Sequence, residues 1–240
     1  RALHCIPELE NHLPKTCAFV KAQLQGLGCT VTEPIEGAVC AFFDEGKEDT
    51  LAFRADMDAL PITEQTGLPF SSEHPGKMHA CGHDGHTAML LGLAKTVAAR
   101  HGTLRYNVLL VFQPAEENPG GARPLCRSGI FARCHVRAIF GFHLWPGLPL
   151  GEIATRPGAL MAKSSEITLH VHGKSVHISK YQEGADSLLA ASTFLQRVYA
   201  MEREVFPPET PRLLKFGCME AGRIRNAIAA DAVLEGSLRA

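Results

Sequence analysis

The residues best suited to chemistry lie between positions 79 and 143. Cys81 and His83 are two residues apart around a glycine, so both side chains can turn towards one centre. Thiolate and imidazole are good ligands for a divalent transition metal. The alternative is a glycine-rich loop before a helix, in which the histidines are incidental. The carboxylates and the histidine further along the chain favour metal binding.

The adjacent pair Glu116 and Glu117 is unusual directly after a strongly apolar stretch. Two neighbouring carboxylates in a dry pocket repel each other, so a positive charge such as a metal ion should offset them. Adjacent side chains point different ways, so one carboxylate can bind metal while the other faces a metal-bound water. The alternative is a solvated acidic loop, but the flanking Val-Phe-Gln-Pro and Asn-Pro-Gly-Gly predict a tight, ordered turn.

These residue types predict hydrolysis. A metal can lower the pKa of bound water from 15.7 to roughly 7, on the order of 12 kcal/mol of help in making hydroxide. General base assistance adds only about 10²–10⁴-fold in rate. Metal activation therefore dominates, and the chemistry that fits is attack of hydroxide on a carbonyl.

The candidate ligands are Cys81, His83, Glu117 and His143. Four ligands around one zinc would make a closed structural site, whereas four shared by two metals would be too few. We therefore expect a further ligand from a segment beyond residue 240.

Apolar stretches predict the elements that position these residues. We expect strands over 38–43, 50–55, 106–113 and 136–143, and helices over 14–27 and 86–102. The last two strands are almost continuously apolar, which predicts central strands covered on both faces. Strands that alternate with helices are typical of an α/β domain.

Three polar clusters follow three of these strands. The first contains Asp56 and Asp58, the second Glu116 and Glu117, and the third begins at His143. In open α/β sheets, ligands bind at the carboxyl ends of strands. Three such clusters therefore predict one convergent site.

The pattern changes near residue 160. An alternating strand over 165–173, an amphipathic helix over 185–204 and strands over 211–222 and 231–239 predict a smaller α+β domain. The fold class is thus α/β, with a central mixed sheet flanked by helices in residues 1–160 and a second domain in 161–240. The chain stops directly after a strand, so we expect the C-terminal part of the first domain beyond residue 240.

Composition excludes several classes of protein. With 24 Lys and Arg against 25 Asp and Glu, the net charge of −1 gives no electrostatic case for nucleic acid or an anionic membrane. No apolar run approaches the roughly 18 residues that span a bilayer. Eight scattered cysteines in 240 residues predict reduced thiols in a cytoplasmic protein.

Four segments together resemble one family: RADMDALPI, HPGKMHACGHDGHTAMLLGLA, VFQPAEENPGGA and GFHLWPGLPLGEIATRPG. The chain resembles the aminoacylase–carboxypeptidase metallohydrolases, in the branch of auxin-conjugate hydrolases, hippurate hydrolases and N-acetyldiaminopimelate deacetylases. The resemblance implies a catalytic domain, a lid that also makes a homodimer, and two divalent metals. Manganese or zinc is expected, and cobalt or nickel would also suit. It implies hydrolysis of N-acyl amino acids, with N-acetyldiaminopimelate as the first candidate substrate.

The resemblance also implies roles for individual residues. Cys81, His83, Glu117 and His143 match metal ligands, and Glu116 matches the general base that deprotonates water and then protonates the leaving amine. Asp58 matches the acidic residue that orients or polarises the metal site. Asp56 stands where distant relatives carry a metal-binding histidine, so we expect it to support the ligands.

In the lid, His177 matches a histidine that stabilises the oxyanion, often across the dimer. Asn226 and Arg239 match positions that hold the carbonyl and the carboxylate of the substrate. Relatives often carry Pro-His where this chain has Tyr181 and Gln182, so we expect a different lid pocket.

Supporting roles are predicted from the residues alone. We expect Asp84 to orient a ligand histidine, because ligand imidazoles usually need such a partner. We expect His86 to cap its helix or to support His83. Two rival functions remain at this point: a cysteine hydrolase with Cys81 as nucleophile and His83 as base, and a non-catalytic protein with one structural metal.

Overall fold

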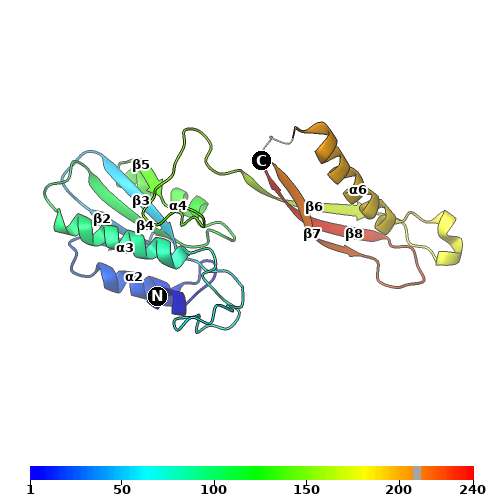
Figure 1. The fold of residues 1–240 in the computed structure, drawn as a ribbon, viewed down its shortest axis with the longest axis horizontal. Coiled ribbons are helices and arrows are strands. Elements are labelled where there is room, and N and C mark those ends of the chain that lie inside the picture. Colours follow the sequence, from blue (N-terminus) through cyan, green and yellow to red (C-terminus); the bar gives the residue numbers. More distant parts are fainter. Residues whose placement is uncertain (208–211) are drawn as a thin grey trace. The chain divides into compact units, whose positions relative to one another are not determined.

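The computed structural model describes residues 1–207 and 212–240. The chain divides into two compact units, Arg1–Leu148 and Pro149–Ala240 (Figure 1). The sequence places the boundary at residue 160, whereas residues 149–160 belong to the second unit. They form no helix or strand, so no backbone pairing ties them to the sheet of the first unit.

The first unit is built on a five-stranded mixed sheet with the order β1-β2-β4-β3-β5. Its strands are β1 (Thr30–Thr32), β2 (Val39–Phe43), β3 (Thr50–Asp56), β4 (Asn107–Gln113) and β5 (Val136–Gly141). β3 pairs in parallel with both β4 and β5, while β2 is antiparallel to β4 and to β1. The C-terminal ends of β4, β3 and β5 therefore lie side by side at the same end of the sheet. The three polar clusters follow these ends, as predicted.

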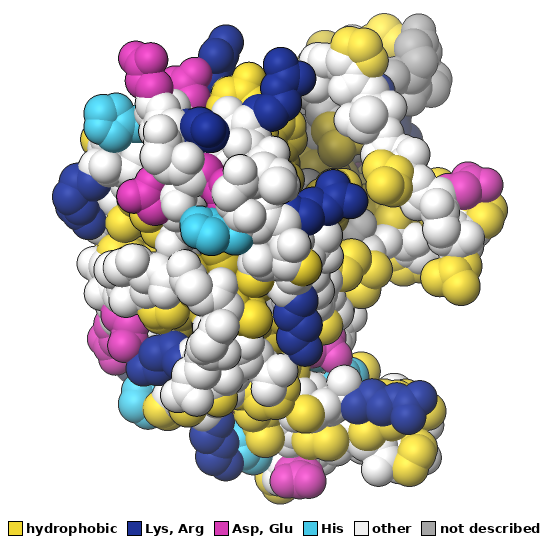
Figure 2. Space-filling view, turned by 90° about the vertical axis from the view of Figure 1, so that its left-hand side faces the viewer, with side chains coloured by type: hydrophobic (Ala, Val, Ile, Leu, Met, Phe, Trp, Pro, Cys, Tyr) yellow, Lys and Arg dark blue, Asp and Glu magenta, His cyan; other side chains and the backbone are white. Residues whose placement is uncertain are grey.

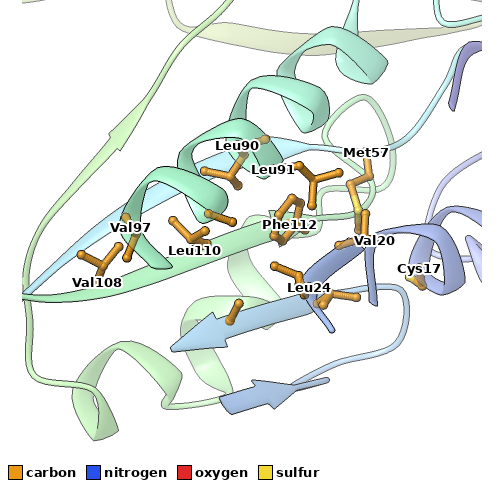
Figure 3. Packing of buried hydrophobic residues seen from close by; sticks show 14 of the residues in the cluster. Cys17, Val20, Leu24, Met57, Leu90, Leu91, Val97, Val108, Leu110 and Phe112 are labelled. Atoms are coloured by element: carbon orange, nitrogen blue, oxygen red, sulfur yellow. The ribbon is translucent and has the colours of Figure 1, made fainter. Parts of the chain in front are cut away.

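Helices cover both faces of this sheet. On one face lie α2 (Pro14–Leu24) and α3 (His83–Ala99). Figure 3 shows Leu90 and Leu91 of α3 and Val20 of α2 pointing towards Phe112 of β4, and all four belong to one buried cluster. Two short helices, α4 (Ala122–Arg127) and α5 (Ile130–Arg133), cover the other face. The first four residues after Arg1 form a short helix, α1 (Ala2–Cys5).

α3 begins three residues earlier than the sequence predicts. Gly82 adopts the left-handed conformation with φ of 87°, which glycine tolerates without a steric penalty. The chain therefore turns into the helix at His83. His83 and His86 consequently share one helix face, three residues apart.

β4 and β5 differ in burial, although both are apolar in sequence. Every residue of β4 is buried, as predicted for a central strand. The same prediction is wrong for β5, where Ile139 is 51% exposed and Phe140 is 48% exposed. β5 is the last strand of the sheet and pairs only with β3, so one of its edges has no partner strand among the described residues.

The second unit is a three-stranded antiparallel sheet with the order β6-β8-β7. The strands are β6 (Ser164–His172), β7 (Leu213–Ala221) and β8 (Asp231–Arg239). The predicted residue 211 lies outside the described residues. α6 (Ser187–Val205) follows a short 3₁₀ helix, η1 (Ile178–Glu183), and packs Ala191 against Ala232 and Leu234 of β8.

The surface agrees with the balanced charge. Figure 2 shows basic and acidic side chains interspersed over one face of the molecule. Among the described residues, no helix is long and apolar enough to span a membrane.

Candidate metal centre

The predicted ligands lie close together beyond the C-terminal ends of the parallel strands. Potential ligand atoms of Cys81, His83 and His143 lie within 4.8 Å of one another, and so do those of His83, Glu116 and Glu117. The Cys81 Sγ atom is 3.4 Å from His143 Nε2, and His83 Nε2 is 3.9 Å from a Glu117 oxygen. His83 thus belongs to both groups and lies at the centre of the site.

One ring nitrogen of His83 is hydrogen-bonded and the other is free to bind a metal ion. The ring is 1% exposed, and its Nδ1 donates to the backbone oxygen of Asp58 at 2.8 Å. Its Nε2 is buried without a hydrogen-bond partner among the described residues. A buried polar atom without a partner costs about 1–3 kcal/mol. A metal ion could bind this free lone pair. The residues present therefore fit the divalent metal predicted from the sequence.

Asp58 fixes the two glutamates through their backbone. Its carboxylate accepts hydrogen bonds from the amides of Glu116 at 2.9 Å and Glu117 at 3.1 Å, one on each oxygen. Ala115, just before the pair, has a positive φ of 50°. The predicted tight turn is therefore present, and Asp58, two residues after the end of β3, holds it.

Glu116 lies beside the ligands and remains accessible. Its side chain is 42% exposed, with one oxygen 4.0 Å from His83 Nε2. Burial, together with the charges of Glu117 and Asp56, raises the pKa of Glu116 above its ordinary value. A carboxyl group with a raised pKa accepts a proton more readily than an ordinary glutamate, as a general base must.

Asp56 lies behind the ligands. One oxygen accepts from His86 Nδ1 at 2.6 Å and lies 3.8 Å from His83 Nε2, while the other accepts from Arg54 at 2.7 Å. Burial raises the pKa of Asp56, but the His86 hydrogen bond and the Arg54 charge outweigh it and hold the pKa at about 2. Asp56 therefore stays ionised as the acceptor for His86.

His86 makes a contact that was not expected from the sequence. Its Nε2 accepts from the backbone amide of Leu144 at 2.9 Å, next to the predicted ligand His143. His86 therefore neither caps α3 nor hydrogen-bonds His83. The His83–His86 spacing on one helix was the only available signal, because a contact with a backbone amide 58 residues away leaves no trace in the sequence.

The prediction for Asp84 needs a correction. Its carboxylate accepts from Nδ1 of His4 at 2.8 Å, and the other ring nitrogen of His4 is 3.3 Å from Glu64. Asp84 points away from His83, although it is the next residue, because consecutive helical side chains face different directions. It anchors the N-terminal segment instead of orienting a ligand.

The candidate lid residues occupy both ends of the second unit. His177 forms an isolated bridge with Ala227, and Ile178 donates to the backbone oxygen of Asn226, so His177 and Asn226 are neighbours. Arg239 lies at the other end of β8, about 27 Å away along the strand at 3.4 Å per residue. The second unit therefore brings two of the three residues together and leaves the third apart.

A hollow of about 440 Å³ lies beside Asn226 in the second unit. Arg223 and Arg225 line it together with Ile178 and Leu188. Neither arginine forms an ion pair with any residue that the structure describes. Asp186 lines it as well, so the hollow combines apolar surface with two arginines and one carboxylate.

The state of Cys81 argues against a cysteine hydrolase. Burial, together with the charges of Glu117 and Glu116, raises the pKa of its thiol to about 11. A nucleophilic cysteine needs a lowered pKa, because the thiolate is the reactive form. As a metal ligand the same thiol would lose its proton to the bound cation.

A donor set of thiol, imidazoles and carboxylates at the carboxyl edge of a mixed sheet defines a class of metal-binding α/β proteins. Residues 52–234 match the peptidase family M20/M25/M40. The chain belongs to this family, which confirms the resemblance drawn from its motifs.

Two curated relatives are N-acetyldiaminopimelate deacetylases. The chain is 38% identical over 242 residues to that of Listeria monocytogenes serotype 4a, covering 100% of this chain and 65% of the relative. It is 37% identical to that of Shouchella clausii, covering 100% and 64%. The chain thus spans slightly less than two thirds of the length of these relatives.

Two solved structures share the fold. The Bacillus subtilis YXEP protein, a dinuclear metal binding peptidase from the M20 family, has a TM-score of 0.79 and 34% identity, covering 99% of this chain and 61% of that protein. A structure from methicillin-resistant Staphylococcus aureus has a TM-score of 0.89 and 33% identity, covering 99% and 64%. The predicted fold class is thereby confirmed.

Proposed function

We propose that the protein is a metal-dependent amidohydrolase that cleaves the amide bond of N-acyl amino acids. The observation that carries the proposal is the convergence of Cys81, His83, Glu117 and His143 around an unpaired, buried imidazole nitrogen, with Glu116 beside them. The family and the names of the curated relatives support the same reaction. Glu116 and His143 remain exposed, which supports an open centre that a substrate can reach.

The centre would hold two divalent cations. Cys81, His83, Glu117 and His143 would supply ligands to them, and a further ligand would come from elsewhere in the whole protein. Thiolate, imidazole and carboxylate together suit zinc, manganese, cobalt and nickel. The dinuclear description of the Bacillus subtilis relative supports the count of two.

When bound, the cations would supply an activated water and polarise the carbonyl of the amide. Glu116 would accept the proton of the attacking water and deliver it to the leaving nitrogen. Asp58 would fix the positions of Glu116 and Glu117 by accepting hydrogen bonds from their backbone amides. His177 would donate a hydrogen bond to the oxyanion, with Asn226 at the carbonyl and Arg239 at the carboxylate of the amino acid.

The separation of the lid residues supports a homodimer formed through the second unit. An N-acyl amino acid is much shorter than the distance of about 27 Å along β8 between Arg239 and the end near Asn226. One substrate therefore cannot contact both ends of the same second unit. A second copy would supply His177 and Asn226 to a site that takes Arg239 from the first copy.

The substrate we propose first is N-acetyldiaminopimelate. It follows the name of the curated relatives. The hollow beside Asn226 has two arginines against one carboxylate, Asp186, and this net positive charge supports an acidic substrate. The eight free thiols support a reducing, cytoplasmic location.

A panel of N-acyl amino acids with neutral, basic and dicarboxylic side groups tests the reaction. The whole protein is assayed with each substrate after loading with Zn²⁺, Mn²⁺, Co²⁺ or Ni²⁺, and metal content is measured in parallel. We expect release of free amino acid that stops on chelation and returns with metal. Metal binding without hydrolysis of any substrate would contradict the proposal.

A further inference from the structure

His143 needs an external support, because its own segment supplies little. β5 ends at Gly141, and residues 142–160 form no helix or strand. His143 is exposed, and its Nδ1 bonds only the backbone oxygen of the next residue, Leu144, at 2.7 Å. A candidate ligand on an irregular, exposed segment would lose much of its binding energy to ordering of the chain. Something outside the segment must therefore hold it.

The support comes from α3. The amide of Leu144 donates to His86 Nε2 at 2.9 Å, and the rings of His86 and His143 meet edge to face with centroids 4.6 Å apart. The Leu144 side chain packs on the same helix, where a Cβ at Gly85 would lie 2.6 Å from Leu144 Cδ1. Leu144 can therefore pack against α3 only because Gly85 has no side chain.

His86 is itself fixed by a chain of charged and polar groups. The ring is 2% exposed, and its Nδ1 is 2.6 Å from Asp56, which is paired with Arg54 at 2.7 Å. Arg54 in turn donates to Gln113 at the end of β4. The segment after β5 is thereby connected through α3 to the ends of β3 and β4.

Both nitrogens of His86 are occupied, which decides its role. Asp56, His83 and His86 are close enough to form a metal-binding group. However, Nδ1 must carry the proton that Asp56 accepts, and the lone pair of Nε2 receives the Leu144 amide. No lone pair is left for a cation, so His86 is not a ligand.

We propose that His86 is a positioning residue, which acts through the Leu144 amide to hold His143 opposite Cys81. The Cys81–His143 distance of 3.4 Å joins ligands from two segments 62 residues apart, and His86 is the side chain that ties these segments together. The positioning role rests on the proposed metal-dependent function, whereas the Leu144 hydrogen bond can be tested in metal-free protein.

Hydrogen exchange in the metal-free wild-type protein is the first test. Among the described residues, the amides of His143 and Trp145 donate no hydrogen bond, whereas the amide of Leu144 donates one. The Leu144 amide should therefore exchange more slowly than both neighbours, relative to the rates of an unstructured peptide. Equal protection at all three positions would overturn the proposal, and this comparison needs no variant.

Two substitutions separate the contacts of His86. His86→Asn keeps a donor for Asp56 but has no acceptor that reaches Leu144, whereas His86→Gln places an amide oxygen near the position of Nε2. We expect exchange at Leu144 to accelerate roughly two- to tenfold in His86→Asn and to stay near wild type in His86→Gln. Equal rates in the two variants would overturn the proposal.

The matched control is His101→Asn. His101 follows the same helix and its Nδ1 donates to Glu45 at 2.7 Å, so the same substitution changes a histidine that bonds a carboxylate without touching the segment after β5. Exchange at Leu144 should not change in this control.

Metal affinity provides the second readout. With Zn²⁺ as the probe and a competing chelator, affinity in the whole protein should fall 10–100-fold in His86→Asn and be largely retained in His86→Gln. Faster exchange at Leu144 with unchanged Zn²⁺ affinity would overturn the positioning of His143. A protein that fails to hydrolyse any acyl amino acid, yet shows both effects, would contradict only the proposed reaction.

Discussion

Asp58 and His86 act in the same way at the scale of single residues. Each accepts hydrogen bonds from backbone amides of a segment that carries candidate ligands. Such contacts set the positions of Glu116, Glu117 and His143 without contributing a donor atom. A pocket whose ligands lie on irregular segments needs this support, because side chains on loops are otherwise held less firmly than those on helices or strands.

Replacement of Glu116 tests the proton transfer. In Glu116→Ala we expect a loss of about 10²–10⁴-fold in turnover, because the proton acceptor is removed while the four candidate ligands remain. Metal content, measured by elemental analysis, should stay at the wild-type level. Asp44→Asn, a change on an exposed turn whose side chain bonds only Gly46, serves as the control. Normal turnover in Glu116→Ala would refute the assignment of the base.

Asp56 gives the centre a defined response to acid. Its pKa is about 2 in the folded protein, below its ordinary value of 3.8. A carboxyl group whose pKa is lowered by folding stabilises the protein above the unfolded pKa, and this contribution is lost as pH falls from about 4 to about 2.

We therefore expect metal-free wild-type protein to lose on the order of 1 kcal/mol between pH 5 and pH 3 through Asp56 alone, with the rest lost below pH 3. Urea unfolding at pH 5 and pH 3, compared with the same measurement on Asp56→Asn, isolates the contribution. The variant should be less stable at pH 5 but show a smaller difference between the two pH values. An identical difference in both proteins would show that Asp56 does not carry this effect.

At the scale of elements, the parallel triplet β4-β3-β5 determines where the chemistry lies. All three strands run in the same direction, so the segments that follow them emerge at one edge. α3 adds Cys81 and His83 at its N-terminal end. The strands are not equivalent, since β4 is fully buried and β5 lies at the edge of the sheet.

This difference in burial predicts that shortening a side chain to alanine lowers the stability of the protein more in β4 than in β5. Leu110 of β4 is fully buried, so Leu110→Ala should destabilise the protein by about 2–5 kcal/mol. Ile139 of β5 is 51% exposed, so Ile139→Ala should cost less than about 1 kcal/mol. Urea unfolding of both variants measures the two values. A cost at Ile139 as large as that at Leu110 would mean that β5 is buried in the whole protein.

At the scale of the whole molecule, the second unit has its candidate substrate residues at opposite ends. Arg239 pairs with Ser164 at one end of the sheet, and Asp231, next to the Asn226 segment, pairs with His172 at the other. In the homodimer proposed above, each site would take residues from opposite ends of the second units of two copies.

Mixing two inactive variants tests this arrangement. His177→Asn and Arg239→Gln should each lose most activity alone. The two variants are then unfolded and refolded together, so that half of the dimers contain one copy of each. If each site takes His177 from one copy and Arg239 from the other, every mixed dimer has one complete site. The mixture should therefore regain about a quarter of wild-type activity. Refolded mixtures that stay inactive, although dimeric by light scattering, would contradict the exchange.

The sequence by itself determined the order of the elements and the candidate ligands. Apolar stretches of strand length and the Cys81–His83 spacing are local features, set by side-chain burial and by the short reach between neighbouring residues. The convergence of three polar clusters also followed, because strands of one direction end at one edge. The family motifs added roles for Glu116 and Asp58 that spacing alone could not assign.

Only the tertiary structure decided which polar groups bond each other. His4 with Asp84, and His86 with Leu144, join residues 80 and 58 positions apart, and one partner of the second pair is a backbone amide of no particular sequence. The exposure of β5 likewise depends on what packs beside it, which its own apolar residues cannot specify. Hydrogen bonds and burial depend on distances in space, and a sequence records only distances along the chain.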